Sequence, residues 1–195
     1  MPILGVIASS NQQARANVVT GSYDALAVYT VPSGGVSSIT FAGIPQSGYQ
    51  HLQIRILTKD NKASANSNNM GGYFNTDSNA SNYYWHFLDG DGSSAYAGSS
   101  TGTSTLALNF ALNTSASSNA NTFGVSIVDI LDYTNTNKNK VIRALMGIDL
   151  NGSGQIRFAS GLWNNTSAIN SITLNPQGSN NFVQYTQAAL YGIRG

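Results

Sequence analysis

The stretch HFLDGDGSS, residues 86–94, places two aspartates and two glycines directly after an aromatic run. It can be laid over the calcium-loop pattern D-x-[DN]-x-[DN]-G-x5-E, in which side-chain oxygens surround the ion. Asp89 and Asp91 fill the first two ligand positions, but Ser93 and Ser94 stand where a third ligand and a glycine belong. Ser100 replaces the closing carboxylate, so the pattern is broken.

A second stretch, DLNGSG at 149–154, has a well-placed glycine in Gly154, but Ser160 replaces its closing acid. Asp-Gly and Asn-Gly are also preferred hairpin connections, because these residues tolerate positive φ. We therefore expect turns, in which the two aspartates of the first stretch serve backbone geometry and solvation, and no cofactor. Four residues remain as weak metal candidates: Asp89, Asp91, Asp149 and Asn151.

Residues suited to acid–base or nucleophilic catalysis are sparse. His51 and His86 are the two imidazoles, and no serine lies in a G-x-S-x-G elbow. Asp129 and Asp132 could pair as carboxylates for glycoside hydrolysis, yet no supporting motif surrounds them and the chain contains no Glu. The sequence therefore predicts a protein that is not an enzyme.

Aromatic side chains near Asn and Asp form the third candidate site. Tyr84 and Trp85 precede the Asp-Gly stretch, and Trp163 precedes two asparagines. Tyr and Trp combine an apolar ring with a polar group, which suits contact with a sugar. Strand alternation would put Trp85 on the face of Tyr83 and Phe87, with Tyr84 on the opposite face. We favour core or subunit contact for both tryptophans and keep three candidate glycan contacts: Tyr84, Trp85 and Trp163.

The composition indicates which elements must position these residues. Asn, Ser, Thr and Gly fill more than two fifths of the 195 residues, and Glu, a good helix former, is absent. The abundant residues compete for backbone hydrogen bonds or favour turns, so the bias favours strands and loops. A hydrophobic content of 41% distinguishes the chain from a disordered one.

Charge and cysteine content exclude several classes of partner and site. The formal net charge is +1 and the basic residues are scattered, so we expect no nucleic-acid partner. The chain has no cysteine, and therefore no disulfide or thiolate site. The opening MPILGVIASS is shorter than the roughly 20 apolar residues that span a bilayer, and we expect no membrane insertion.

Period-two alternation recurs between turn signals and predicts about ten short strands. The clearest is 49–58, with Leu52, Ile54 and Ile56 on one face. Residues 23–31 and 36–41 are expected to form a hairpin. The remaining expected strands are 70–75, 83–88, 105–112, 123–131, 140–147, 155–163, 170–174 and 182–193. The fold class is all-β: a single-domain antiparallel β-sandwich, jelly-roll-like.

Two further expectations concern which residues are buried and which are exposed. In 123–131 the alternation assigns Phe123, Val125 and Ile127, with Leu131, to the buried face. The polar stretches 59–69 and 113–122 are expected to be exposed or packed against another chain, because they have little apolar area to bury.

The two ends of the chain are the predicted contact segments. Residues 1–20 are expected to form an N-terminal arm and 21–195 the sandwich domain, although an ordinary edge strand would also explain the apolar start of the arm. An apolar arm and an apolar C-terminal segment suit contact with other subunits. The candidate subunit or partner contacts are Ile3, Leu4, Val6, Ile7, Leu190, Tyr191 and Ile193.

The chain resembles small virion-associated structural proteins of tailed bacteriophages, common in aquatic and cyanobacterial phages. Five stretches carry the resemblance: MPILGVIASS, SSITFAGIPQSGYQHLQIRI, VDILDYTNTNKNKVIRALMG, SGLWNNTSAINSITL and ALYGIRG. It implies a non-enzymatic β-rich component of the virion exterior, assembled in the host cytoplasm and oligomeric.

The expected function is a capsid decoration or cement protein, a trimer or dimer that contacts phage capsid or tail proteins through its arm. The alternative is a tail-fibre or receptor-binding tip that recognises host surface glycan.

Overall fold

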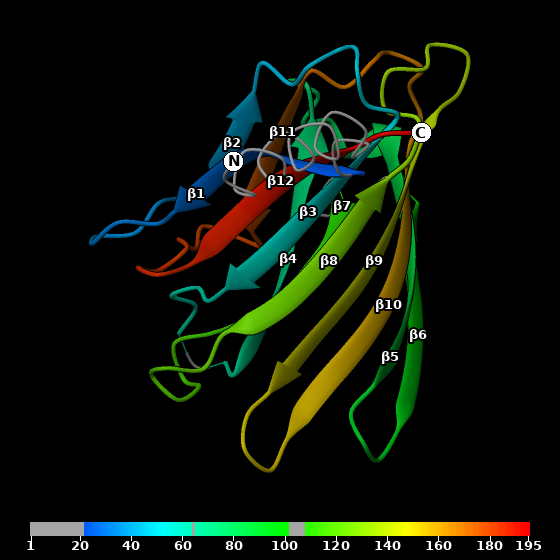
Figure 1. The fold of residues 1–195 in the computed structure, drawn as a ribbon. Helices are drawn as coiled ribbons and strands as arrows, with labels where there is room; N and C mark the ends of the chain where they lie inside the picture. The colour runs from blue at the N-terminus through cyan, green and yellow to red at the C-terminus, as the bar shows by residue number, and fades with distance from the viewer. Residues whose placement is uncertain (1–21, 64, 102–107) are drawn as a thin grey trace, which may run out of the picture.

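The computed structural model describes residues 22–63, 65–101 and 108–195, which form a sandwich of two antiparallel sheets (Figure 1). This confirms the predicted all-β class. The elements are β1 Tyr23–Thr30, β2 Ile39–Ala42, β3 His51–Thr58, β4 Ser67–Phe74, the 3-10 helix η1 Ala80–Asn82, β5 Tyr83–Gly90, β6 Ala95–Thr101, β7 Leu108–Thr114, β8 Gly124–Ile130, β9 Lys140–Asp149, β10 Gly154–Trp163, β11 Ser171–Pro176 and β12 Gln187–Ile193.

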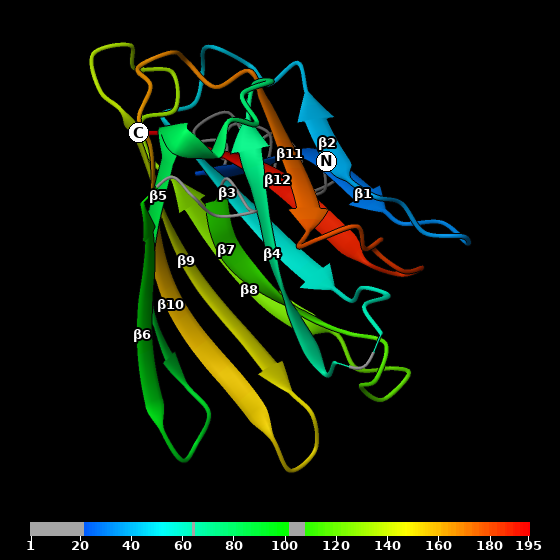
Figure 2. The ribbon, with the colours of Figure 1, turned by 180° about the vertical axis from the view of Figure 1, so that it is seen from behind.

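Eight of these strands wind as a jelly roll. β1, β12, β3 and β8 are neighbours in the larger sheet, and β2, β11, β4 and β7 form the smaller sheet. The pairs β1 with β12, β2 with β11, β3 with β8 and β4 with β7 follow one another along an antiparallel ribbon. The ribbon folds over so that its strands alternate between the sheets, which is the jelly-roll arrangement. Figure 2 shows the smaller sheet lying in front of the larger one.

Two further hairpins extend the larger sheet. β5 and β6 lie in the chain between β4 and β7, and β9 and β10 lie between β8 and β11. They give an eight-stranded sheet of order β1-β12-β3-β8-β9-β10-β5-β6. In Figures 1 and 2 both hairpins reach beyond the end of the smaller sheet. The outer face of the larger sheet, away from the smaller one, therefore continues across the roll and the added hairpins.

Tight turns close both hairpins. Asn151 and Gly152 connect β9 to β10 with φ values of 58° and 114°, and the Leu150 N–H donates to the Ser153 carbonyl at 2.8 Å. Gly92, with φ 90°, turns the chain from β5 to β6. These are the positive-φ positions that Asn and Gly supply at hairpins, so the expected turns are confirmed.

One expected pairing is wrong. Residues 23–31 and 36–41 were expected to form a hairpin, but β1 pairs with β12 and β2 pairs with β11. The turn that begins at Pro32 carries the chain from one sheet to the other, because a jelly-roll ribbon crosses between sheets there. The strand β6 was not predicted, since AYAGSST has little hydrophobic alternation.

The core lies between the two sheets and is densest at an aromatic cluster. Tyr83 and Trp163 stack with ring centroids 6.2 Å apart, and Phe74 meets Trp163 edge-on at 5.7 Å. The Trp163 indole donates to Asp77 Oδ2 at 2.8 Å, and the Tyr83 hydroxyl donates to the Asp77 carbonyl at 2.8 Å. Burial raises the pKa of the Tyr83 hydroxyl. The predicted burial of Leu52, Ile54 and Ile56 is confirmed.

Candidate functional site

Asp89 is a buried counter-ion and not a turn or metal residue. It lies in β5 with 4% of its surface exposed. Arg157 Nε and Nη2 donate to its two carboxylate oxygens at 2.5 and 2.6 Å, and Gln155 Nε2 donates at 2.6 Å. The expectation that Asp89 serves turn geometry and solvation is therefore wrong. Asp89 lies inside β5, which ends at Gly90, and the turn begins only after that residue.

Arg157 uses the same guanidinium to join the two sheets. Its Nη1 donates to Asn69 Oδ1 on β4 at 2.8 Å and to Asn109 Oδ1 on β7 at 3.4 Å. The guanidinium also lies over the Phe87 ring, 4.1 Å from its centroid. A forked cation with this many partners fixes the sheets relative to each other, and it occupies both oxygens of Asp89.

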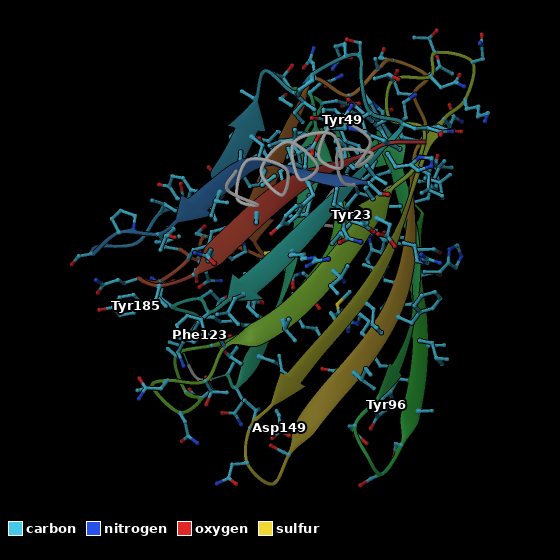
Figure 3. The ribbon with its side chains drawn as sticks, in the orientation of Figure 1. Tyr23, Tyr49, Tyr96, Phe123, Asp149 and Tyr185 are labelled. Atoms are coloured by element: carbon cyan, nitrogen blue, oxygen red, sulfur yellow. The ribbon has the colours of Figure 1, made fainter. Side chains whose placement is uncertain are left out.

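The other weak metal candidates are turn residues. Asp91 Oδ1 accepts from the backbone N–H groups of Ser93 and Ser94 at 2.8 and 2.7 Å, and these bonds lower the pKa of the Asp91 carboxyl. Asp149 Oδ1 accepts from the Asn151 N–H at 3.0 Å. Asp149 is the last residue of β9, and Figure 3 shows it at the end of that strand, next to the turn of the β9–β10 hairpin. Within the described ranges, no three His, Cys, Asp or Glu side chains gather as a metal site would require.

The two carboxylates considered for glycoside hydrolysis are each held by cations and amides. Asp129 accepts from Gln53 Nε2 and from Arg143 Nη2, both at 2.8 Å. Burial opposes ionisation of Asp129, but these hydrogen bonds outweigh it and hold the pKa of the carboxyl below its ordinary value. Asp132 accepts from Lys138 Nζ at 2.7 Å. Both groups therefore serve local ion pairs on the sheet and its loops.

The aromatic candidates do not form one platform. Trp163 is 1% exposed and belongs to the aromatic core, which confirms the favoured interpretation and contradicts its candidate glycan contact. Tyr84 and Trp85 are partly exposed neighbours on β5, so alternation directs them to opposite faces of the sheet. Trp85 stacks on Phe87 with centroids 5.7 Å apart.

The two polar stretches pack on each other within the chain. The N–H groups of residues 115, 116 and 117 donate to the carbonyls of residues 66, 62 and 65 at 3.0 to 3.2 Å. Lys59 Nζ is enclosed by this contact and donates to Ser118 Oγ at 2.7 Å, while burial lowers the pKa of the Lys59 amine. The stretches 59–69 and 113–122 thus pack partly on each other within the chain, and the expected exposure is confirmed for part of them, including residues 61, 63, 66, 116, 117 and 119–121.

The predicted C-terminal contact is wrong for Leu190 and stays a prediction for Tyr191 and Ile193. β12 lies inside the larger sheet between β1 and β3, and Leu190 is buried in the core, so the assignment of Leu190 to a subunit contact is wrong. Tyr191 and Ile193 are partly exposed on the same strand. The proposed contacts in the N-terminal arm, Ile3, Leu4, Val6 and Ile7, lie outside the described residues.

The face predicted to be buried in β8 is the wrong one. Val125 and Ile127 are exposed, as is Leu131 just after the strand, whereas Val128 and Ile130 are in the core. β8 carries large apolar side chains on both faces, so alternation cannot select one.

The register of β8 has a second consequence. Ser126, between Val125 and Ile127, lies on the core face of β8, and its buried Oγ has no hydrogen-bond partner among the described residues. The chain thus buries an unpaired hydroxyl while leaving two β-branched hydrophobic residues outside. Such an arrangement is expected where the outer face is also covered.

The exposed face of β8 belongs to a continuous apolar surface, which we call the outer band. It crosses five neighbouring strands, because Leu57 pairs with Val125, Ile127 with Leu145, Leu145 with Phe158, and Phe158 with Leu88. Its side chains are 41 to 59% exposed. The outer band consists of Leu57, Leu88, Val125, Ile127, Leu145, Ile156 and Phe158.

Two glycines hollow the outer band. Gly147 lies between Val125 and Ile156 in the pairing, and Gly90 pairs with Ile156 from the other side. A hollow of about 200 Å³ lies beside Gly147, and one of about 330 Å³ lies beside Gly90. Leu145 and Ile156 line both hollows.

Neither glycine is required by the backbone or by its neighbours. Both lack positive φ, and a Cβ would come no closer than 3.8 Å to other atoms at Gly147 and 3.9 Å at Gly90. In contrast, a Cβ at Gly161 would lie 2.8 Å from core side chains. A strand glycine without an internal reason often marks the close approach of another molecule.

In comparisons with known proteins, no protein-family model and no curated protein matches this chain. In the described part of the chain, no helix is long and apolar enough to cross a membrane.

Proposed function

We propose that this protein is a non-enzymatic structural subunit that functions by assembly, as a component of the exterior of a tailed-phage virion and specifically as a capsid decoration or cement protein. The observation that carries the proposal is the outer band, a continuous apolar surface at or above the size of the largest patch on a typical monomer, roughly 300–600 Å². The five stretches that resemble virion-associated proteins support the particular assembly. The fold alone does not favour one function over another, because jelly rolls occur in capsid proteins, lectins and enzymes alike.

The chemistry of the candidate sites supports the same role. The carboxylates examined for metal binding or catalysis, such as Asp89 and Asp129, are engaged by Arg157 and Arg143. The residues with unexplained exposure are apolar and lie on one face of a sheet. An apolar sheet face suits a permanent contact between proteins more than it suits turnover of a substrate.

The direct test is association with particles. Virions of the phage that encodes the chain are purified and analysed by quantitative mass spectrometry, and tagged recombinant protein is added to particles that lack it. We expect the protein in numbers comparable to the major capsid protein and saturable binding of the added protein. Absence from purified virions refutes the proposal, whereas a few copies per particle would place the protein on the tail.

The N-terminal arm provides a second measurement. Deleting residues 2–20 is expected to abolish particle binding while circular dichroism and the melting temperature of the sandwich stay unchanged. Undiminished binding by the deleted chain would contradict a clamp formed by the arm.

A further inference from the structure

We propose that the outer band is the contact surface between two copies of this chain, which pack face to face through their larger sheets about a two-fold axis. This rests on the proposed function, since it names the first partner in assembly. Three features of the outer band point to a second copy: its area, its relief and the placement of charge around it.

The area fits a stable pair. Seven large apolar side chains, each about half exposed, offer roughly 600–700 Å² per copy, so a face-to-face pair would bury about 1,300 Å². Specific protein interfaces of standard size bury about 1,200–2,000 Å² in total. The outer band alone thus reaches the required range without help from the loops.

The relief of the surface is self-complementary. A two-fold contact uses one patch twice, so the patch must hold both the projecting groups and the spaces that receive them. Phe158 and Ile156 project from β10, and the hollows beside Gly147 and Gly90 lie on either side of that strand in the sheet. The glycines allow the partner's side chains to enter where a side chain on this copy would have fitted.

Charged side chains lie along one edge of the outer band, and none of its members is charged. Arg55 on β3 pairs with Ile127 at the edge of the outer band, and the ion pair of Arg143 with Asp129, at 2.8 Å, lies in the next row of the same face. Arg143 is the more exposed partner, with 65% of its side chain accessible. Across a two-fold axis these groups fall at opposite ends of the contact, which gives the polar rim and apolar centre of specific interfaces.

The test compares two substitutions on one strand of the full-length chain. Leu145 and Val141 lie on the same face of β9 and are 50% and 49% exposed, but only Leu145 belongs to the outer band. Leu145→Asp is expected to weaken self-association on the order of a hundredfold or more, because each copy buries an unpaired carboxylate. Val141→Asp, the matched control, leaves it unchanged. Analytical ultracentrifugation gives the mass and the dissociation constant.

Cross-linking keeps the proposal testable if Leu145→Asp fails to fold. The chain contains no cysteine, so Leu145→Cys, Ile156→Cys and Val141→Cys each introduce a unique thiol. With a short bis-maleimide we expect covalent dimers from the first two variants and none from the third. A monomeric wild-type protein, equal effects of the two Asp substitutions, or no cross-link from either outer-band thiol would overturn the proposal.

The two proposals fail in different ways. A dimer formed through the outer band by a protein absent from virions keeps this inference and refutes the virion role. A monomer whose particle binding is lost in Leu145→Asp but not in Val141→Asp keeps the virion role and assigns the outer band to another virion protein. A monomer that becomes a dimer when residues 2–20 are deleted assigns the outer band to the chain's own N-terminal segment. The last two outcomes overturn the proposal of a second copy.

Discussion

Replacing Asp89 by Asn should strongly destabilise the fold, because it removes the counter-ion of a buried guanidinium. Asp89 and Arg157 are 4% and 5% exposed, and Arg157 donates to both carboxylate oxygens within 2.6 Å. Asn has nearly the same shape but presents an NH₂ group to one of these donors. Breaking one partner of a buried pair costs about 3–5 kcal/mol of the free energy of unfolding.

The effect is large enough for thermal and urea unfolding. For a chain of this size, 1 kcal/mol corresponds to about 2–4 °C, so Asp89→Asn should lower the melting temperature by roughly 6–20 °C. Asp91→Asn in the same hairpin is the matched control, because Asp91 is exposed and accepts only from groups of that hairpin, the Ser93 and Ser94 N–H groups and the Tyr96 hydroxyl. We expect it to cost about 1 kcal/mol or less.

Two results would contradict this reasoning. One is an Asp89→Asn protein that unfolds within 1 °C of the wild type, about a quarter to a half of a kcal/mol. The other is equal destabilisation by Asp89→Asn and Asp91→Asn, which would mean that the position in the hairpin matters and the buried pair does not.

Three further predictions follow from groups around the sheets. Ser126→Ala removes the unpaired buried hydroxyl and should raise the free energy of unfolding by about 1 kcal/mol in urea titrations; a loss of stability would indicate that the hydroxyl has a partner. Burial raises the pKa of Asp77, but hydrogen bonds from Trp163 and Asn82 outweigh it and hold the pKa below its ordinary value. The stability from this ionised carboxyl is therefore present above about pH 4 and lost as the pH falls through the folded pKa, so the difference between wild type and Asp77→Asn should shrink between about pH 7 and pH 3. The melting temperature should be the same in calcium and in chelator, because the aspartates of the candidate loops are engaged in turns and an ion pair; stabilisation by calcium would disprove this.

The parts of the fold predicted from sequence are those in which one face of a strand is clearly more apolar. β3, with Leu52, Ile54 and Ile56 inside, is such a strand. β6 was not predicted because large apolar and polar residues do not alternate in its sequence, AYAGSST. Pairing partners could not be predicted either, since β1 meets β12 across nearly the whole chain.

The candidate site, the outer band, could not be predicted from the sequence. In β8 both faces carry large apolar side chains, so alternation predicts the wrong face, and two exposed members of the outer band, Val125 and Ile127, are predicted to be core. The glycines at 90 and 147 could not be interpreted without the structure, since only the space around them shows that they are not needed internally. The signal present in the sequence was a strand with too many hydrophobic residues for a half-buried sheet.

The two hairpins that extend the larger sheet carry four of the seven members of the outer band, while Leu57, Val125 and Ile127 lie on the ribbon strands β3 and β8. Leu88, Leu145, Ile156 and Phe158 lie on β5, β9 and β10, and none of these strands belongs to the jelly-roll ribbon. Related chains could therefore exchange or reshape these hairpins, and so change their binding partner, while the ribbon pairs and the core between the sheets stay intact. We expect sequence divergence among relatives to be concentrated on the outer positions of these hairpins wherever the partner differs.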